Sequence, residues 1–185
     1  IGGDETPRKK WSECPDCQAL MKKEGMTEEA QLQSWITTKV ENYLETKGKR
    51  IIGWDEVLEG GVSTKCVVMS WLKGSVGGQK AAGLGNDVIM TDKYHCYFDC
   101  YQTDTREGEL FAHKRNIPLE KVWSYNPIGG MDDASASHVL GVQCNTWTEH
   151  ISSMDRVYFM NLPRMAALAE VAWSTPASLS GYQDF

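Results

Sequence analysis

The sequence predicts an α/β fold with a parallel sheet, and three observations support this prediction. Short apolar segments recur along the chain without alternating polar residues, as expected for strands that are covered on both faces. Segments with helical periodicity separate several of these strands. Polar and aromatic residues follow the predicted strands directly, and the carboxyl ends of parallel strands are where α/β proteins gather functional groups.

The predicted strands are short. The first covers residues 50–54 and reads Arg-Ile-Ile-Gly-Trp. The other three cover residues 66–71, 87–90 and 139–144. The stretch 91–138 between the last two is too long for an ordinary loop, so we expect it to form an extended excursion at the rim of the sheet.

The clearest predicted helix covers residues 28–47, with Thr27 as its N-cap and Gly48 as its stop. Its apolar residues recur at helical spacing and predict one buried face. They are Leu32, Trp35, Ile36, Val40, Tyr43 and Leu44. Further helices are predicted over residues 15–24, 77–82 and 154–173, the last interrupted by Pro163.

Composition limits the functional classes. The chain has 185 residues, 41% of them hydrophobic, which is enough for one packed domain. A net charge of −6, with no basic cluster longer than Arg8-Lys9-Lys10, argues against a nucleic-acid partner. The longest apolar stretch, around residues 66–72, is too short to span a membrane.

Six cysteines are present, and two of them form the motif Cys14-Pro-Asp-Cys17. This spacing occurs in zinc sites and redox motifs, but a structural zinc needs a second pair and a redox motif usually follows a strand. We therefore expect a structural pair or a local disulfide. The remaining cysteines lie in apolar segments and are predicted to be buried thiols.

The segment Gly2-Gly3-Asp4-Glu5 is the most informative part of the sequence. Adjacent strand residues point to opposite faces, so both carboxylates can serve one site only if the backbone turns, which the glycines permit. Two neighbouring carboxyl groups resist simultaneous ionisation, so one of them can stay protonated as a general acid. Alone, such a pair is more often an exposed acidic turn.

The order of further motifs along the chain favours a functional site at Asp4 and Glu5 over an exposed acidic turn. Trp54-Asp55-Glu56, Ser70-Trp71, Tyr97-Phe98-Asp99 and Asn145-Thr146-Trp147-Thr148-Glu149 follow at successive strand ends. Together with Gly-Gly-Asp-Glu, this series resembles the β-N-acetylhexosaminidases of glycoside hydrolase family 20, over essentially the whole chain. The resemblance implies a (β/α)8 TIM-barrel fold, of which residues 1–185 are the C-terminal half of a single catalytic domain.

The resemblance implies a retaining exo-glycosidase that removes terminal non-reducing β-linked GlcNAc or GalNAc. The substrate's own acetamido group acts as nucleophile and forms an oxazolinium intermediate. Glu5 is implied as general acid and Asp4 as the partner of the acetamido N–H. Tyr97 is implied as donor to the acetamido oxygen, and the implied sugar-binding residues are Trp54, Trp71, Trp147, Asp99 and Glu149.

Other functions stay open at this stage, namely a non-catalytic sugar-binding relative or an inactive fragment. The family also uses an arginine from an earlier barrel strand, and no residue of this chain matches it. A half barrel exposes strand edges, which leaves homo-oligomerisation open. We expect a carbohydrate partner, no metal and no organic cofactor, and by analogy a periplasmic, outer-surface or secreted location.

Some conspicuous residues are given no catalytic part. Trp11, Trp35, Trp123 and Trp173 are interpreted as structural, and Asp55 and Glu56 as braces of the rim. His95, His138 and His150 are interpreted as hydrogen-bonded scaffold, which is the commoner role of a lone histidine.

Overall fold

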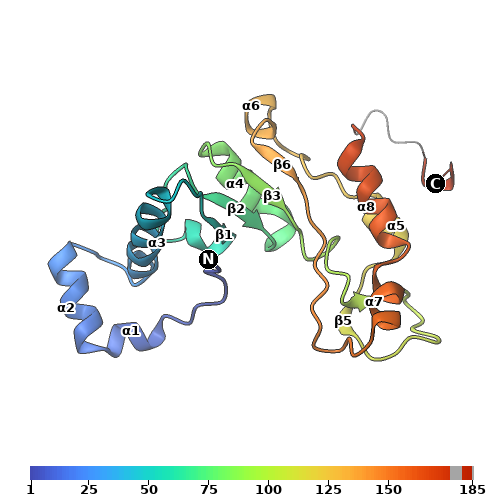
Figure 1. Ribbon diagram of the computed structural model, residues 1–185, viewed down its shortest axis with the longest axis horizontal. Coiled ribbons are helices and arrows are strands. Elements are labelled where there is room, and N and C mark those ends of the chain that lie inside the picture. The colour runs from blue at the N-terminus through green and yellow to red at the C-terminus, as the bar shows by residue number, and fades with distance from the viewer. Residues whose placement is uncertain (176–180, 185) are drawn as a thin grey trace.

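The computed structural model describes residues 1–175 and 181–184, and its centre is a four-stranded parallel sheet (Figure 1). The strands are β1 (Ile52–Trp54), β2 (Val67–Ser70), β3 (Val88–Met90) and β6 (Val139–Val142), paired in that order. In register, Gly53 pairs with Val68, Val68 with Val88, and Val88 with Val139. The predicted parallel α/β arrangement is confirmed.

The first residues of the chain run beside β1 and extend the sheet. The amino group of Ile1 donates to the Ile52 carbonyl at 3.0 Å, and the Trp54 N–H donates to the Gly2 carbonyl at 3.0 Å. The turn that carries Asp4 and Glu5 therefore begins at the carboxyl end of the sheet, next to the end of β1.

Helices connect and cover the strands. Their bounds are α1 (Lys9–Glu13), α2 (Pro15–Glu24), α3 (Ala30–Glu45), α4 (Val76–Gly83), α5 (Leu119–Trp123), α6 (Asp133–Ala136), α7 (Met154–Asn161) and α8 (Arg164–Trp173), with 3₁₀ turns η1 (Asp55–Leu58), η2 (Lys73–Ser75) and η3 (Tyr182–Asp184). Helix α4 packs on β2 and β3, and a Cβ at Gly78 would stand only 2.6 Å from the Met90 sulfur. A glycine is therefore needed for this close approach.

Helix α3 departs from the prediction in two ways. It begins at Ala30 rather than at Glu28, and its N-cap is Glu29 rather than Thr27. The Thr27 N–H instead donates to the Gln31 side chain at 2.7 Å. The buried face also differs from the apolar one. Ile36 and Tyr43 are 52% and 63% exposed. The residues of α3 that are buried are Leu32, Gln33, Thr37 and Glu41.

Hydrogen bonds explain why polar residues of α3 face inward. Gln33 donates to the Gly3 carbonyl at 2.6 Å and accepts from Arg8 at 2.8 Å. Glu41 accepts from the Ser63 hydroxyl at 2.7 Å. Buried polar groups are tolerated when they are bonded in this way, so α3 anchors the Asp4 turn by polar contacts rather than by an apolar stripe.

The predicted rim excursion contains a small second sheet. Strands β4 (Cys100–Tyr101) and β5 (His113–Asn116) pair in parallel, and the His113 N–H donates to the Asp99 carbonyl at 3.0 Å. Both strands lie near α7, away from the main sheet (Figure 1).

Arg164, at the start of α8, ties this excursion to the helices. Its guanidinium is fully buried and donates to the carbonyls of Phe98, Cys100, Ile117 and Met160. It also lies 4.8 Å from the centre of the Phe98 ring. Burial lowers the pKa of Arg164 to about 10.

The cysteines and Trp173 differ in part from what the sequence predicts. All six cysteines are free thiols, so the expected local disulfide between Cys14 and Cys17 is not formed in this structure. Cys66, Cys96 and Cys100 are buried, as predicted, whereas Cys144 is only half-buried, so the prediction is wrong for that residue. Trp173 is 91% exposed, so its interpretation as a packed structural residue is wrong for the described part of the chain. Among the described residues no helix has the length and apolar character needed to cross a bilayer.

Candidate active site

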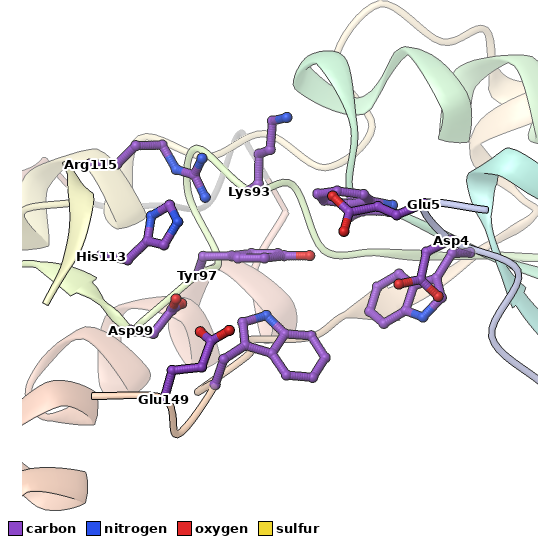
Figure 2. Close-up of a pocket in the computed structure, with 11 residues that line it drawn as sticks. Asp4, Glu5, Lys93, Tyr97, Asp99, His113, Arg115 and Glu149 are labelled. Atoms are coloured by element: carbon purple, nitrogen blue, oxygen red, sulfur yellow. The ribbon is translucent and has the colours of Figure 1, made fainter. Parts of the chain in front are cut away.

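A cleft of about 410 Å³ lies at the carboxyl end of the sheet (Figure 2). Its lining comes from the first turn, the ends of β1, β2, β3 and β6, and the excursion that carries β5. The lining residues are Asp4, Glu5, Trp54, Trp71, Lys93, Tyr97, Asp99, His113, Arg115, Trp147 and Glu149.

The carboxylates of Asp4 and Glu5 reach this cleft because the backbone turns sharply. Gly2 and Gly3 have φ of +74° and +99°, and Glu5 itself has φ of +47°. A positive φ is rare for a residue with a side chain, and such strain is concentrated at functional sites. Both carboxylates are exposed to solvent, and Figure 2 shows them at the same end of the cleft. The turn predicted from the glycines is confirmed.

Glu56 braces this end of the cleft by two hydrogen bonds. One carboxylate oxygen accepts the backbone N–H of Glu5 at 3.2 Å, and the other accepts the indole N–H of Trp71 at 2.9 Å. Only 8% of Glu56 is exposed. The turn that carries Asp4 and Glu5 and the cleft wall at Trp71 are therefore held by one side chain, which confirms the predicted bracing role.

Asp55 fixes the segment after β2. Its Oδ2 accepts the Leu72 N–H at 3.3 Å and the Ser70 hydroxyl at 3.4 Å. Burial raises the pKa of Asp55 to about 6, against the lowering effect of the Leu72 N–H. A Cβ at Gly77 would stand 2.2 Å from Asp55 Oδ2, so the second residue of α4 must be glycine for the helix to pack on Asp55.

Four aromatic rings form a box in the middle of the cleft. Trp54 lies 6.3 Å from Trp71 and 6.1 Å from Trp147, measured between ring centres. Tyr97 lies 6.1 Å from Trp71, nearly parallel to it at 19°, and 6.2 Å from Trp147. The box presents flat apolar surfaces around a space that is closed on several sides, which suits a small ring with an apolar face.

Tyr97 spans the cleft between its two ends. The ring is buried, and Figure 2 shows its hydroxyl directed toward the Asp4–Glu5 end. Burial raises the pKa of Tyr97, so the hydroxyl keeps its proton and remains a donor at neutral pH. The backbone is held by Asn145, whose carbonyl accepts the Phe98 N–H at 2.7 Å.

Asp99 and Glu149 occupy the opposite end. Asp99 is 6% exposed, burial raises its pKa, and its Oδ1 has no hydrogen-bond partner among the described residues. Glu149 is exposed. Figure 2 shows the Asp99 carboxylate between Glu149 and the imidazole of His113. Carboxylates in this position can accept hydrogen bonds from hydroxyl groups of a ligand.

The structure thus brings all eight sequence-predicted site residues to one cleft, and it adds three basic residues. Lys93 Nζ lies 5.1 Å from the centre of the Trp71 ring, and the Arg115 guanidinium lies 5.9 Å from that of Tyr97. His113 is the third. Lys93 follows the strand at 87–90 closely, so the strand-end rule could have found it. Nothing local marks His113 or Arg115.

The histidines singled out from the sequence lie outside the cleft lining. His95 Nδ1 bonds Asp92 at 2.5 Å and its ring stacks on Tyr125 at 4.8 Å. His138 bonds Asp87 at 3.3 Å. The scaffold interpretation is confirmed for both. Among the described residues, Asp99, Cys100 and His113 are a group whose side chains could share a metal ion, since their ligand atoms lie within 4.8 Å of one another.

The chain is similar to known proteins in both sequence and fold. The model of glycosyl hydrolase family 20, catalytic domain, matches residues 1–176. A β-hexosaminidase of Porphyromonas gingivalis is 41% identical, with 100% of this chain and 24% of the relative covered. A β-hexosaminidase of Vibrio furnissii is 36% identical, with 91% of this chain and 28% of the relative covered. The chain therefore spans about a quarter of the length of these curated relatives.

A solved structure shows the same fold. The family 20 exo-β-N-acetylglucosaminidase of Vibrio harveyi, in complex with N-acetylglucosamine, superposes with a TM-score of 0.87 at 33% identity. The match covers 100% of this chain and 29% of that one. The four parallel strands therefore have the fold of part of a TIM-barrel catalytic domain.

Proposed function

Because the chain belongs to glycosyl hydrolase family 20, we propose that its cleft is the active site of a retaining exo-glycosidase for terminal, non-reducing β-linked N-acetyl-D-hexosamine. The observation that carries the proposal is the meeting of two carboxylates, an aromatic box and two further carboxylates in one cleft of about 410 Å³. Each group suits a different part of an N-acetylhexosamine.

Glu5 is proposed as the general acid. It protonates the glycosidic oxygen as the bond to the anomeric carbon breaks, and it then accepts a proton from the incoming water. Its exposure to solvent supports this role, because the acid must exchange protons with water between turnovers. The same residue serves both steps, as microscopic reversibility requires.

Asp4 and Tyr97 are proposed to orient the acetamido group. Asp4 accepts the acetamido N–H and stabilises the positive charge that develops on the group, while the Tyr97 hydroxyl donates to the acetamido oxygen. That oxygen attacks the anomeric carbon and forms an oxazolinium ion. Water then opens the ion from the opposite face, so two inversions retain the configuration. The direction of the Tyr97 hydroxyl toward Asp4 and Glu5 supports this arrangement (Figure 2).

The aromatic box is proposed to hold the acetamido methyl group and one face of the sugar ring. Trp54, Trp71, Tyr97 and Trp147 supply the walls, with ring centres 6.1 to 6.3 Å apart. Such a box favours substrates that carry the acetamido group, since a hydroxyl in its place would lose apolar contact. At the far end, Asp99 and Glu149 are proposed to accept hydrogen bonds from sugar hydroxyls, which would supply the missing partner of Asp99 Oδ1.

The test is turnover of an aryl β-N-acetylglucosaminide by the intact protein, with the matching aryl β-glucoside as control. Turnover confined to the acetamido substrate is expected. Glu5→Gln should abolish most of it, whereas Glu13→Gln, an exposed glutamate on α1, should not. Equal turnover of both substrates, or unchanged turnover in Glu5→Gln, would contradict the proposal.

The leaving group sharpens this test. A dinitrophenolate departs without protonation, so the loss in Glu5→Gln should be much smaller for that substrate than for a poorer leaving group. A loss of the same size for both would mean that Glu5 is not the acid. The expected periplasmic, outer-surface or secreted location stays a prediction, which cell fractionation would check.

A further inference from the structure

Three potential metal ligands meet where the rim excursion joins the cleft. The ligand atoms of Asp99, Cys100 and His113 all lie within 4.8 Å of one another. Backbone pairing brings them together, because Cys100 and His113 are register partners of β4 and β5 and the His113 N–H donates to the Asp99 carbonyl at 3.0 Å. The group is thus built into the pairing of the two strands.

The Asp99 carboxylate gives a second sign of a ligand, which a cation can supply when no sugar hydroxyl occupies this end of the cleft. Only 6% of the residue is exposed, yet Oδ1 has no hydrogen-bond partner among the described residues. A buried acceptor without a partner is costly, so such an atom is expected to meet a donor or a cation when the site is in use. The neighbouring thiol of Cys100 is fully buried, and burial raises its pKa.

The donor set selects the class of ion. One sulfur, one imidazole nitrogen and one carboxylate oxygen, with water as a fourth ligand, suit tetrahedral Zn²⁺. Thiolate disfavours Mg²⁺ and Ca²⁺. Ligand atoms around Zn²⁺ stand roughly 3.5 Å apart, so the most separated atoms of the cluster must approach by at most about 1 Å. Rotation of the solvent-accessible His113 side chain can supply that movement.

Charge balance permits binding despite two nearby arginines. Arg115 lies close enough to interact with the Cys100 thiol, and Arg164 also acts on it. Binding displaces the thiol proton, so the charges of the Asp99 carboxylate and the Cys100 thiolate together offset those of a divalent ion. The arginines then face a neutral centre.

We propose that Asp99, Cys100 and His113 bind one Zn²⁺ ion, and that the bound ion closes the hydroxyl-binding end of the cleft. That Zn²⁺ competes with the sugar rests on the proposed function, because it assumes that Asp99 accepts a sugar hydroxyl. That the three residues bind Zn²⁺ does not depend on the proposed function. The ion acts here as an inhibitor, and no step of the proposed reaction passes through it.

Cobalt spectroscopy tests the site without any activity measurement. The intact protein is titrated with Co²⁺ in a Cys14→Ser/Cys17→Ser background, which removes the other close pair of thiols. We expect one equivalent to give thiolate-to-cobalt charge-transfer absorption, and Zn²⁺ to displace it. Cys100→Ser and His113→Ala should each abolish the band, and His138→Ala should retain it. No band, or a band that survives Cys100→Ser, would overturn the proposed site.

Inhibition is measured separately. Zn²⁺ should raise KM for the aryl N-acetylglucosaminide at least tenfold with kcat unchanged, and the ratio of KM with and without Zn²⁺ should fall close to one in Cys100→Ser. Cobalt binding with no change in KM would overturn the competition. Should the intact protein turn over no substrate, the proposed function fails, and the cobalt titration still decides whether the metal site exists.

Discussion

Replacing Glu56 by Gln should reduce catalysis although Glu56 is not expected to touch the substrate. Its two carboxylate oxygens accept one N–H each, from the Glu5 backbone at 3.2 Å and from the Trp71 indole at 2.9 Å. Glutamine has one acceptor oxygen and one NH₂ donor. One of the two N–H groups must then face another donor, so either the Glu5 turn or the Trp71 wall loses its support.

The size of the effect follows from these contacts. Leaving one buried N–H unpaired costs about 1–3 kcal/mol. The protein can avoid part of this cost only by moving the Glu5 turn or the Trp71 ring away from its position in the cleft. If the cost appears fully in the transition state, kcat/KM drops by roughly 5- to 150-fold. Because Glu5 and Trp71 are proposed to act on the reaction centre, we expect most of the loss in kcat rather than in KM.

The assay is steady-state turnover of the aryl β-N-acetylglucosaminide, with the melting temperature measured in parallel. Glu59→Gln is the matched control, since Glu59 is next to the same 3₁₀ turn but is exposed and pairs with Arg8 at the surface. Unchanged kcat in a folded Glu56→Gln protein would refute the bracing argument. So would an equal loss in Glu59→Gln.

Two further predictions concern the cleft wall and the pH dependence of stability. Trp147→Ala removes one wall of the proposed sugar site, and the lost apolar contact with the substrate, about 1–3 kcal/mol, should lower kcat/KM by roughly 5- to 150-fold. The melting temperature should change less, because Trp147 is 43% exposed. Trp173→Ala is the control, and an equal loss of kcat/KM there would contradict the prediction. Asp55 has a folded pKa of about 6 against an ordinary 3.8, so its contribution to stability is lost as pH rises between these values. Asp55→Asn should flatten the stability profile in that window, Asp16→Asn should not, and an unaltered slope in Asp55→Asn would count against the raised pKa.

The sequence predicted the features that depend on local chemistry. The turn at Gly2 and Gly3 was predictable because only a bend at the strand end can turn both adjacent carboxylates toward one site. The helix at 15–24 was predicted with the bounds that the structure has, and in the structure proline occupies its first turn and Gly25 caps its end. The parallel strands followed from their apolar runs. These signals all lie within a few residues of the feature they predict.

The features that were missed depend on contacts between distant segments. The buried face of α3 could not be predicted from periodicity, because Gln33 and Glu41 are buried by bonds to Gly3 and Ser63. His113 enters the cleft only because β5 pairs with β4. The oxidation state of the Cys14-Pro-Asp-Cys17 motif could not be predicted either, because it depends on redox conditions rather than on spacing.

The buried guanidinium of Arg164 affects which parts of the protein unfold together. It gathers carbonyls from Phe98, Cys100, Ile117 and Met160, so the excursion and the last helices share one set of hydrogen bonds. No carboxylate takes part in these bonds, so added salt has little to screen. Amide protons on both sides of Arg164 should therefore exchange with solvent in one cooperative opening. The far wall of the cleft, including Asp99 and His113, is then only as durable as the C-terminal helices that hold it.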